Sequence, residues 1–346
     1  MRLFLSELRK LLFCNYALII MLAAVVLQAV TELIPRTYEF SYSIDVYKRY
    51  TEKLEGDYTA ETEFFLRSLY EEYCVLIDEY DLHRTEYING KITLEDFSTY
   101  TAQNSTAKAE ITTIQYLLEK CEYFNNAEGF QKEIFYDTDI TYFFEGLGFD
   151  LIMLLTLLCI VIPVFDREFT GGATSLILTS RYGKSRLAVL KMLASMTVIF
   201  VFSWCLSALR LESHFLKYGS DFFDRAVGNL MGYDGFGNVS ILNYYLTDTL
   251  IKSVCWAICA AKVCLITVIC RNTSFSFIIS FLIISAPILL NGVGSGTAEM
   301  YIFDTVNLMR PYPSLLHFGI FAAGSGFKIT VFGWLTVRFW GHRNKI

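Results

Sequence analysis

Six apolar segments run through this chain of 346 residues, and each is long enough to cross a lipid bilayer as a helix. The hydrocarbon core of a bilayer is about 30 Å thick, so a spanning helix needs about 20 residues. Composition supports this assignment, because 54% of the residues are hydrophobic and only 18% are charged, against about 25% charged in soluble domains. The sequence therefore predicts an all-α membrane protein with six transmembrane helices. The expected spans are approximately 11–34, 147–165, 187–209, 249–270, 274–290 and 315–339.

The Lys and Arg residues near the ends of these segments predict the orientation, since cytoplasmic loops of membrane proteins carry an excess of both. Basic residues gather before the first span, between spans two and three, between spans four and five, and after span six. We therefore expect a multi-pass protein of the plasma membrane with both termini in the cytoplasm. The first span is expected to stay in the mature chain, because its apolar stretch exceeds the roughly 7–15 residues of a signal peptide.

This topology divides the chain into three parts: 1–34 (entry helix and first span), 35–146 (external helical domain) and 147–346 (five-span membrane domain). The external domain is acidic. Residues 36–145 hold 10 Lys and Arg against 23 Asp and Glu, a net charge of −13, so the other residues carry +7 within the total of −6. The overall acidic charge argues against a nucleic-acid partner. The acidic surface is interpreted either as a solvated face or as an attractor of cationic peptides or divalent ions.

Helical periodicity dominates the external domain, where apolar residues recur at steps of three and four on both sides of Asn89-Gly90. This Asn-Gly pair is a turn signal, and Thr93 with Asp96 matches the pattern of an N-terminal helix cap. We expect an antiparallel hairpin of two long helices. The sequence does not decide whether the second helix is interrupted near Asn104–Ser105.

Nine cysteines are present, and seven lie in the expected spans, where a thiol acts as a small apolar filler. Cys74 and Cys121 lie in the external domain, where a disulfide could persist. An ideal hairpin places these two residues at different heights, so their pairing stays open. No cluster of His, Cys, Asp and Glu suggests a metal site, and no catalytic set is visible. We expect neither a bound metal nor an enzymatic activity on this chain.

The segment between spans two and three, at about 166–186, is too polar to lie in lipid but carries adjacent apolar residues at 176–178. It suits a short amphipathic helix on the inner membrane face. The N-terminal sequence from Ser6 to Leu11, which includes Glu7, also suits an amphipathic helix, and Pro-Ser-Leu-Leu at 313–316 precedes the last span. The cytoplasmic segment supplies, in order, Glu168, Gly171, Thr174, Ser185, Arg186 and Lys191.

In these features the chain resembles the membrane subunits of type-2 ABC exporters. In that family an acidic residue follows the second span, and a Gly, a Thr, a Ser-Arg pair and a Lys follow in the same order. The resemblance implies that 166–186 is a coupling helix that docks on a separate cytoplasmic ATP-binding subunit, with Glu7 and Arg181 also at that interface. It implies a permease that works as a homodimer or with a related second subunit. Bacterial subfamilies linked to peptide export or antimicrobial-peptide protection share the large loop after the first span.

ATP and Mg are expected on the partner subunit, and no cofactor is expected on this chain. Gly183-Lys184-Ser185 looks like the end of a phosphate-binding loop. That loop needs a Gly five positions before Gly183, where this chain has Leu178. The segment is therefore not expected to bind ATP.

Spans four and six are the weaker assignments because they contain lysines, Lys252 and Lys262 in span four and Lys328 in span six. Charges within a membrane are costly and are by default a functional hypothesis. Lys262 and Lys328 could line a translocation path with Asp150 in span two or with Asp248 before span four. The alternative is that the Lys262 side chain reaches the interface along its own stem, and that span six is shifted toward its C-terminal end around Lys328.

The sequence therefore favours a permease subunit that exports a peptide, an antibiotic or a lipid. The alternative is a non-transport membrane sensor whose external helical domain binds a ligand.

Overall fold

The computed structural model describes residues 2–14, 16–34, 40–145, 150–170, 185–220, 222–291 and 315–341. The chain forms two compact units, each built from separate stretches of sequence. Unit 1 comprises Met1–Pro35, Gly146–Asp221 and Leu242–Ile346, and unit 2 comprises Arg36–Glu145 and Phe222–Ile241.

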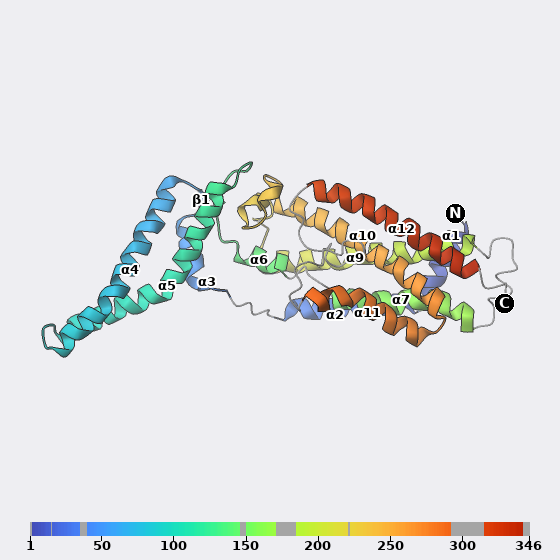
Figure 1. Ribbon diagram of the computed structural model, residues 1–346, viewed down its shortest axis with the longest axis horizontal. Coiled ribbons are helices and arrows are strands. Elements are labelled where there is room, and N and C mark those ends of the chain that lie inside the picture. The colour runs from blue at the N-terminus through green and yellow to red at the C-terminus, as the bar shows by residue number, and fades with distance from the viewer. Residues whose placement is uncertain are drawn as a thin grey trace. The chain divides into compact units, whose positions relative to one another are not determined.

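Each apolar segment predicted as a span coincides with a helix of unit 1 (Figure 1). A short amphipathic helix precedes the first of them and continues into one turn of π-helix. The elements of unit 1 are α1 (Arg2–Arg9), η1 (Lys10–Cys14), α2 (Ala17–Leu33), α7 (Leu151–Thr170), α9 (Arg186–Tyr218), α10 (Ile241–Cys270), α11 (Thr273–Asn291) and α12 (Leu315–Gly341).

Two of the described helices, α9 and α10, are long and apolar enough to cross a membrane. A third candidate arises if the bent pair of α1 and α2 is counted as one span. The apolar parts of α7 (Leu151–Asp166) and α11 (Thr273–Ala286) are shorter. The apolar content of the sequence is thus concentrated in helices of unit 1.

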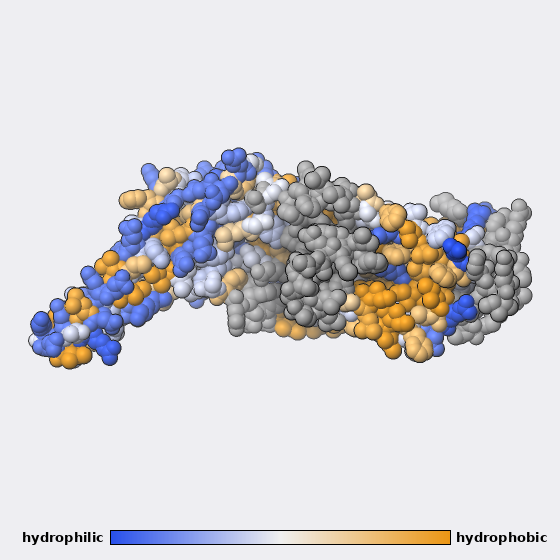
Figure 2. All heavy atoms as spheres, in the orientation of Figure 1, coloured by the Kyte–Doolittle hydropathy of each residue, from blue (hydrophilic) through white to orange (hydrophobic). Residues whose placement is uncertain are grey.

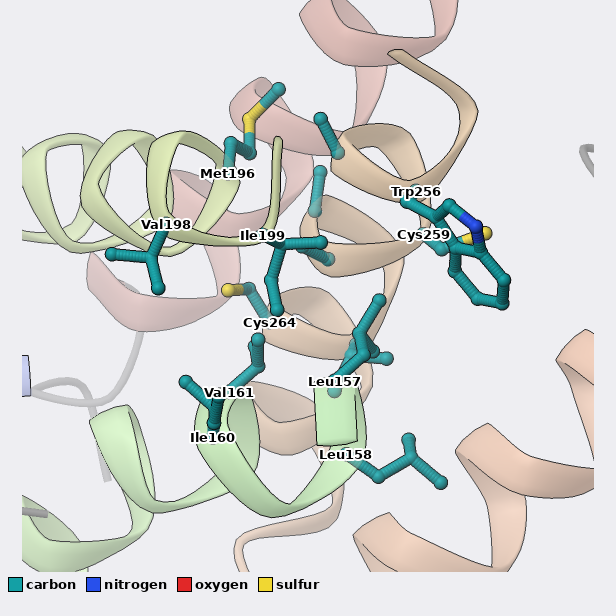
Figure 3. Close-up of a cluster of buried hydrophobic side chains, with 14 of the residues drawn as sticks. Leu157, Leu158, Ile160, Val161, Met196, Val198, Ile199, Trp256, Cys259 and Cys264 are labelled. Atoms are coloured by element: carbon teal, nitrogen blue, oxygen red, sulfur yellow. The ribbon is translucent and has the colours of Figure 1, made fainter. Parts of the chain in front are cut away.

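The interior of unit 1 is a continuous apolar cluster in which α7 packs against α2, α9 and α11. Figure 3 shows Val161 of α7, Ile199 of α9 and Cys264 of α10 gathered in the space between their helices. All three side chains are fully buried. The thiol of Cys264 therefore acts here as a small filler among aliphatic side chains.

Large apolar side chains also cover the outside of unit 1. On α2, Ile19, Leu22 and Leu33 are 65%, 65% and 75% exposed, and Figure 2 shows hydrophobic residues over much of the visible described surface of this unit. Water-soluble monomers rarely expose apolar patches larger than a few hundred Å². An apolar exterior around an apolar interior is the pattern expected of helices surrounded by lipid.

Unit 2 is built on the predicted hairpin. Helix α4 (Ala60–Ile88) and α5 (Leu94–Asn126) lie side by side, joined by a turn in which Gly90 has φ 68° (Figure 1). The capping box is confirmed, because the Thr93 side chain accepts from the Asp96 N–H and the Asp96 carboxylate accepts from the Thr93 N–H. Helix α5 continues through Asn104 and Ser105, so the interruption left open in the sequence does not occur.

Shorter elements complete unit 2 around the base of the hairpin. Helix α3 (Ile44–Lys53) packs against α5, and β1 (Gly56–Asp57) pairs with β2 (Glu133–Ile134) in an antiparallel two-stranded sheet. Helix α6 (Thr138–Glu145) follows β2.

A second stretch of sequence, Phe222–Ile241, belongs to unit 2 and includes η2 (Val227–Asn229) and η3 (Asp234–Phe236). Tyr123 Oη donates to the Gly228 carbonyl at 2.8 Å, and the Glu133 N–H donates to Asn229 Oδ1 at 2.9 Å. Gly228 is needed at this contact, because a Cβ there would lie 2.8 Å from the Phe130 ring. The predicted domain boundary after residue 146 did not include this stretch.

The core of unit 2 contains a buried ion pair. Lys120 Nζ lies 2.6 Å from Asp137 Oδ2 and 3.3 Å from Tyr47 Oη, and Tyr47 donates to Asp137 Oδ1 at 2.7 Å. The Lys120 side chain is 1% exposed. Burial, and then the neighbouring Asp137 carboxylate, raise the pKa of Tyr47 well above its ordinary value. The three groups satisfy one another and tie α3 and α5 to the segment that leads into α6.

Neither Cys74 nor Cys121 forms a disulfide in the structure. Cys121 faces the region of Glu63 and Arg67, whereas Tyr73, next to Cys74, hydrogen-bonds to Glu110. Cys74 lies seven residues beyond Arg67, about 10 Å along α4 at the usual helical rise. Burial also raises the pKa of the Cys121 thiol to about 11, which keeps the thiol protonated near neutral pH.

The Lys120→Ala variant tests the buried ion pair of unit 2. Removal of Lys120 leaves the Asp137 carboxylate buried without its cation, which typically costs about 3–5 kcal/mol. We expect faster hydrogen exchange of the α3 and α5 amides in the full-length chain. The exposed Lys108→Ala is the matched control, and equal exchange in the two variants would contradict the role of the pair.

Candidate functional site

The residues predicted to contact an ATPase subunit fall into three groups. Gly171, Thr174 and Arg181 lie outside the described residues. Glu168 lies in the last turn of α7, where the helix is described but its side chain is not. The others, which lie in α1 or at the start of α9, are described fully: Glu7, Ser185, Arg186 and Lys191.

Two of these predicted residues contact each other across the chain. Lys191 Nζ lies 3.6 Å from Glu7 Oε2, and Lys10 Nζ lies 2.8 Å from Glu7 Oε1. Lys191 also donates to the Val164 carbonyl of α7 at 2.9 Å, and its ammonium lies 5.6 Å from the centre of the Phe165 ring. We name Glu7, Lys10, Lys191, Val164 and Phe165 the entry-helix cluster. It joins α1, α7 and α9.

Further contacts bring two more helices to the same end of α7. The Phe165 ring packs edge-on against Trp340 of α12 with a centroid separation of 5.4 Å, and Trp340 is fully buried. Thr273 at the start of α11 donates to the Asp166 carboxylate. Packing and hydrogen bonds therefore hold the end of α7 and the start of α9 in place.

These contacts fix the helices at both ends of the predicted coupling segment. Helix α7 ends at Thr170 and α9 begins at Arg186, and both helices are joined by Lys191. Ser185 and Arg186 are exposed, whereas the Glu7 and Lys191 side chains are 6% and 5% exposed. Within this chain, Glu7 and Lys191 therefore position the segment ends, and Ser185 and Arg186 are accessible to a partner.

A second ionic group lies toward the other end of α9. Arg210 Nε lies 3.2 Å from Glu32 Oε1 on α2, and Arg210 Nη2 lies 3.5 Å from Asp150 Oδ2, just before α7. Gln28 donates to the same Glu32 oxygen at 2.7 Å, and Lys217 donates to the Glu32 carbonyl. We name Glu32, Asp150, Arg210 and Lys217 the Arg210 network. The predicted path residue Asp150 belongs to it.

The two groups bracket an uncharged stretch of α9. Residues 192–209 include no Asp, Glu, Lys or Arg, and Lys191 and Arg210 are 19 residues apart. At 1.5 Å per residue this separation is about 28 Å, close to the hydrocarbon thickness of a bilayer. Since Glu7 contacts Lys191 and Glu32 contacts Arg210, the first helical segment runs parallel to α9.

Helix α7 shows the same spacing in the opposite direction. Asp150 contacts Arg210, and the Val164 carbonyl contacts Lys191, so α7 runs antiparallel to α9. Residues 151–165 of α7 are uncharged. The charged groups of three helical segments thus gather at two levels, with apolar side chains between them.

The predicted path residues Lys262 and Lys328 lie between these levels. Both are buried, at 6% and 8% exposure, on α10 and α12 respectively. Both interact electrostatically with the Cys255 thiol, as does Asp248. The structure thus brings the two lysines into one neighbourhood, whereas Asp150 belongs to the separate Arg210 network.

Sequence reasoning missed Arg210 and Glu32, and it did not pair Asp248 with Lys252. In the structure Lys252 Nζ lies 2.5 Å from Asp248 Oδ2, and both side chains are nearly buried. Their separation of four residues on one helix was a usable signal. Arg210 and Glu32 are 178 residues apart, so nothing local in the sequence pairs them.

Comparisons of the chain with protein-family models, with curated proteins and with solved structures find no match. Among the described residues, no group of three or more His, Cys, Asp and Glu side chains could hold a metal ion. The functional argument therefore depends on the two charged groups and on the segment that the entry-helix cluster holds.

The Glu7→Ala variant tests the entry-helix cluster. Removal of this carboxylate takes one ionic contact from the buried Lys191, and loss of one partner of a buried pair typically costs about 3–5 kcal/mol. We expect α1 to dissociate from α9 and to become a substrate for limited proteolysis. Exposed Arg9→Ala is the control, and resistance of Glu7→Ala equal to this control would contradict the assignment.

Proposed function

We propose that this chain is the membrane-spanning permease subunit of an ABC exporter, driven by a separate cytoplasmic ATPase subunit. The observation that carries the proposal is the entry-helix cluster. Glu7 and Lys191 hold an amphipathic N-terminal helix against both ends of the segment between α7 and α9. These contacts can transmit a force applied to that segment into α1, α7 and α9.

In this proposal six helices cross the plasma membrane of a bacterium: α2, α7, α9, α10, α11 and α12. Helices α7 and α11 have 20 and 19 residues in all, and their apolar parts, Leu151–Asp166 and Thr273–Ala286, are shorter than those of α9 and α10. The bracketing of α9 by charges about 28 Å apart supports this placement. The apolar exterior of unit 1 is then its contact with lipid.

Basic residues support the assignment of sides. Arg9 and Lys10 lie in or next to the entry-helix cluster, Arg186 starts α9, Arg271 follows α10 and Arg338 lies in the last turn of α12. An excess of Lys and Arg marks the cytoplasmic side. Both termini and the coupling segment are therefore cytoplasmic, and unit 2, with its acidic hairpin, is external.

The mechanism follows from these placements. ATP and Mg bind to the partner subunit, and closure of two such subunits moves the segment at 166–186. The buried Glu7–Lys191 pair makes α1 and α9 respond together. A second copy of this chain or a related permease completes the transporter. Lys262 and Lys328 line the path for a peptide, antibiotic or lipid substrate.

A non-transport sensor is the second candidate. The size of unit 2, which includes two stretches of sequence outside the membrane helices, favours a ligand-binding role for it. The two functions differ in whether a cytoplasmic ATPase binds to the chain.

Co-purification of a cytoplasmic ATPase with this chain from its native membrane tests the proposal. We expect the full-length chain in detergent to retain the ATPase, and the double variant Glu168→Ala/Arg186→Ala to lose most of it. Lys91→Ala/Glu95→Ala, which likewise removes one charge of each sign and does so at exposed positions, is the matched control. An undiminished yield with the first double variant would overturn the interface, and a chain without any ATPase would favour the sensor.

A further inference from the structure

The Arg210 network connects the very helices through which the chain enters and leaves unit 2. Helix α2 precedes residues Arg36–Glu145 of unit 2, and α7 follows them. Likewise α9 precedes Phe222–Ile241, and α10 continues from that stretch. These four helices are therefore the ones that lie next to unit 2 along the sequence.

Three of the four helical ends are joined directly at Arg210. Its guanidinium on α9 contacts Glu32, one residue before the end of α2, and Asp150, immediately before α7. The planar guanidinium of Arg presents several N–H donors and can bind two carboxylates at once. A Lys ammonium is a compact point charge and fits this arrangement less well. Lys217, one residue before the end of α9, adds a hydrogen bond to the Glu32 carbonyl.

The fourth helix is coupled electrostatically. The Arg210 charge acts on Asp248 of α10, which forms its own pair with Lys252 at 2.5 Å. Tyr245, one turn before Thr249, donates to the Ser207 carbonyl of α9 at 2.7 Å. Helices α9 and α10 are therefore bonded at the same level as the Arg210 contacts.

The partial burial of these groups makes the contacts strong enough to hold and still separable. The side chains of Arg210, Glu32 and Asp150 are 16%, 14% and 16% exposed. An ion pair that is fully exposed contributes little, and one that is fully buried is costly to break. A partly solvated cluster at a helix end can exchange its protein contacts for water when the ends separate.

We propose that Arg210 closes an outer gate, in which the ends of α2 and α7 are held against α9 and, through α9, against α10. Release of Glu32 and Asp150 from Arg210 opens the external end of the bundle, while the entry-helix cluster keeps the other end closed. The gating role rests on the proposed export function.

Distance measurements between spin labels test the gate in the full-length chain in lipid nanodiscs. One pair, Leu33→Cys with Leu216→Cys, reports the external ends of α2 and α9, and both positions are exposed. A second pair, Leu5→Cys with Leu193→Cys, reports the cytoplasmic ends of α1 and α9. The native cysteines are replaced by Ser or Ala in the chains that carry either label pair.

We expect Arg210→Gln to shift the outer pair by several ångström to longer distances and to leave the inner pair unchanged. Glu32→Gln should give a shift in the same direction, Arg210→Lys a smaller one, and the exposed Arg271→Gln none. An unchanged outer pair in Arg210→Gln would overturn the gate, and so would an equal change in both pairs, since that is loss of packing rather than opening. The ATPase is absent from this experiment, so a failed co-purification and a failed gate are separate results.

Discussion

The cost of placing charge in hydrocarbon is the constraint on which the rest of the structure depends. Helix α9 includes eighteen consecutive uncharged residues, 192–209, and its charged residues Lys191 and Arg210 each bind a carboxylate from the first helical segment. Because the lipid itself is as apolar as Leu, helices in a bilayer gain little from apolar burial alone. The ionic and hydrogen-bonded contacts at the two levels therefore set the register of the helices, and the apolar side chains of Figure 3 fill the space between.

The sequence predicted those elements that local patterns determine. Long apolar segments became helices of unit 1, and Gly90 and Thr93 marked the turn and cap of the hairpin. The contacts that assemble these elements are non-local and were not predictable in the same way. Tyr123 binds the Gly228 carbonyl across 105 residues, and Arg210 binds Glu32 across 178. The proposed interface was predicted only by resemblance. The structure shows that Glu7 and Lys191 are buried in contact with each other, which indicates that they join α1 to α9.

The two charged groups differ in what they can do. The Glu7 and Lys191 side chains of the entry-helix cluster are buried, and the cluster joins three helices at the end where the predicted coupling segment begins and ends. The Arg210 network is partly solvated and joins helices at the end where the chain enters unit 2. Helix α9 connects the two groups, so in the proposed exporter one end of the bundle can stay closed while the other opens.

The assignment of sides is the central claim, and site-directed labelling in intact cells tests it most directly. Single cysteines are placed at Glu72 on the hairpin, at Val239 in the second stretch of unit 2 and at Ser185 before α9, in a chain without its native cysteines. The account predicts that a membrane-impermeant maleimide labels the first two in intact cells, and labels Ser185→Cys only after permeabilisation. Labelling of Ser185→Cys in intact cells, or protection of Glu72→Cys there, would contradict it.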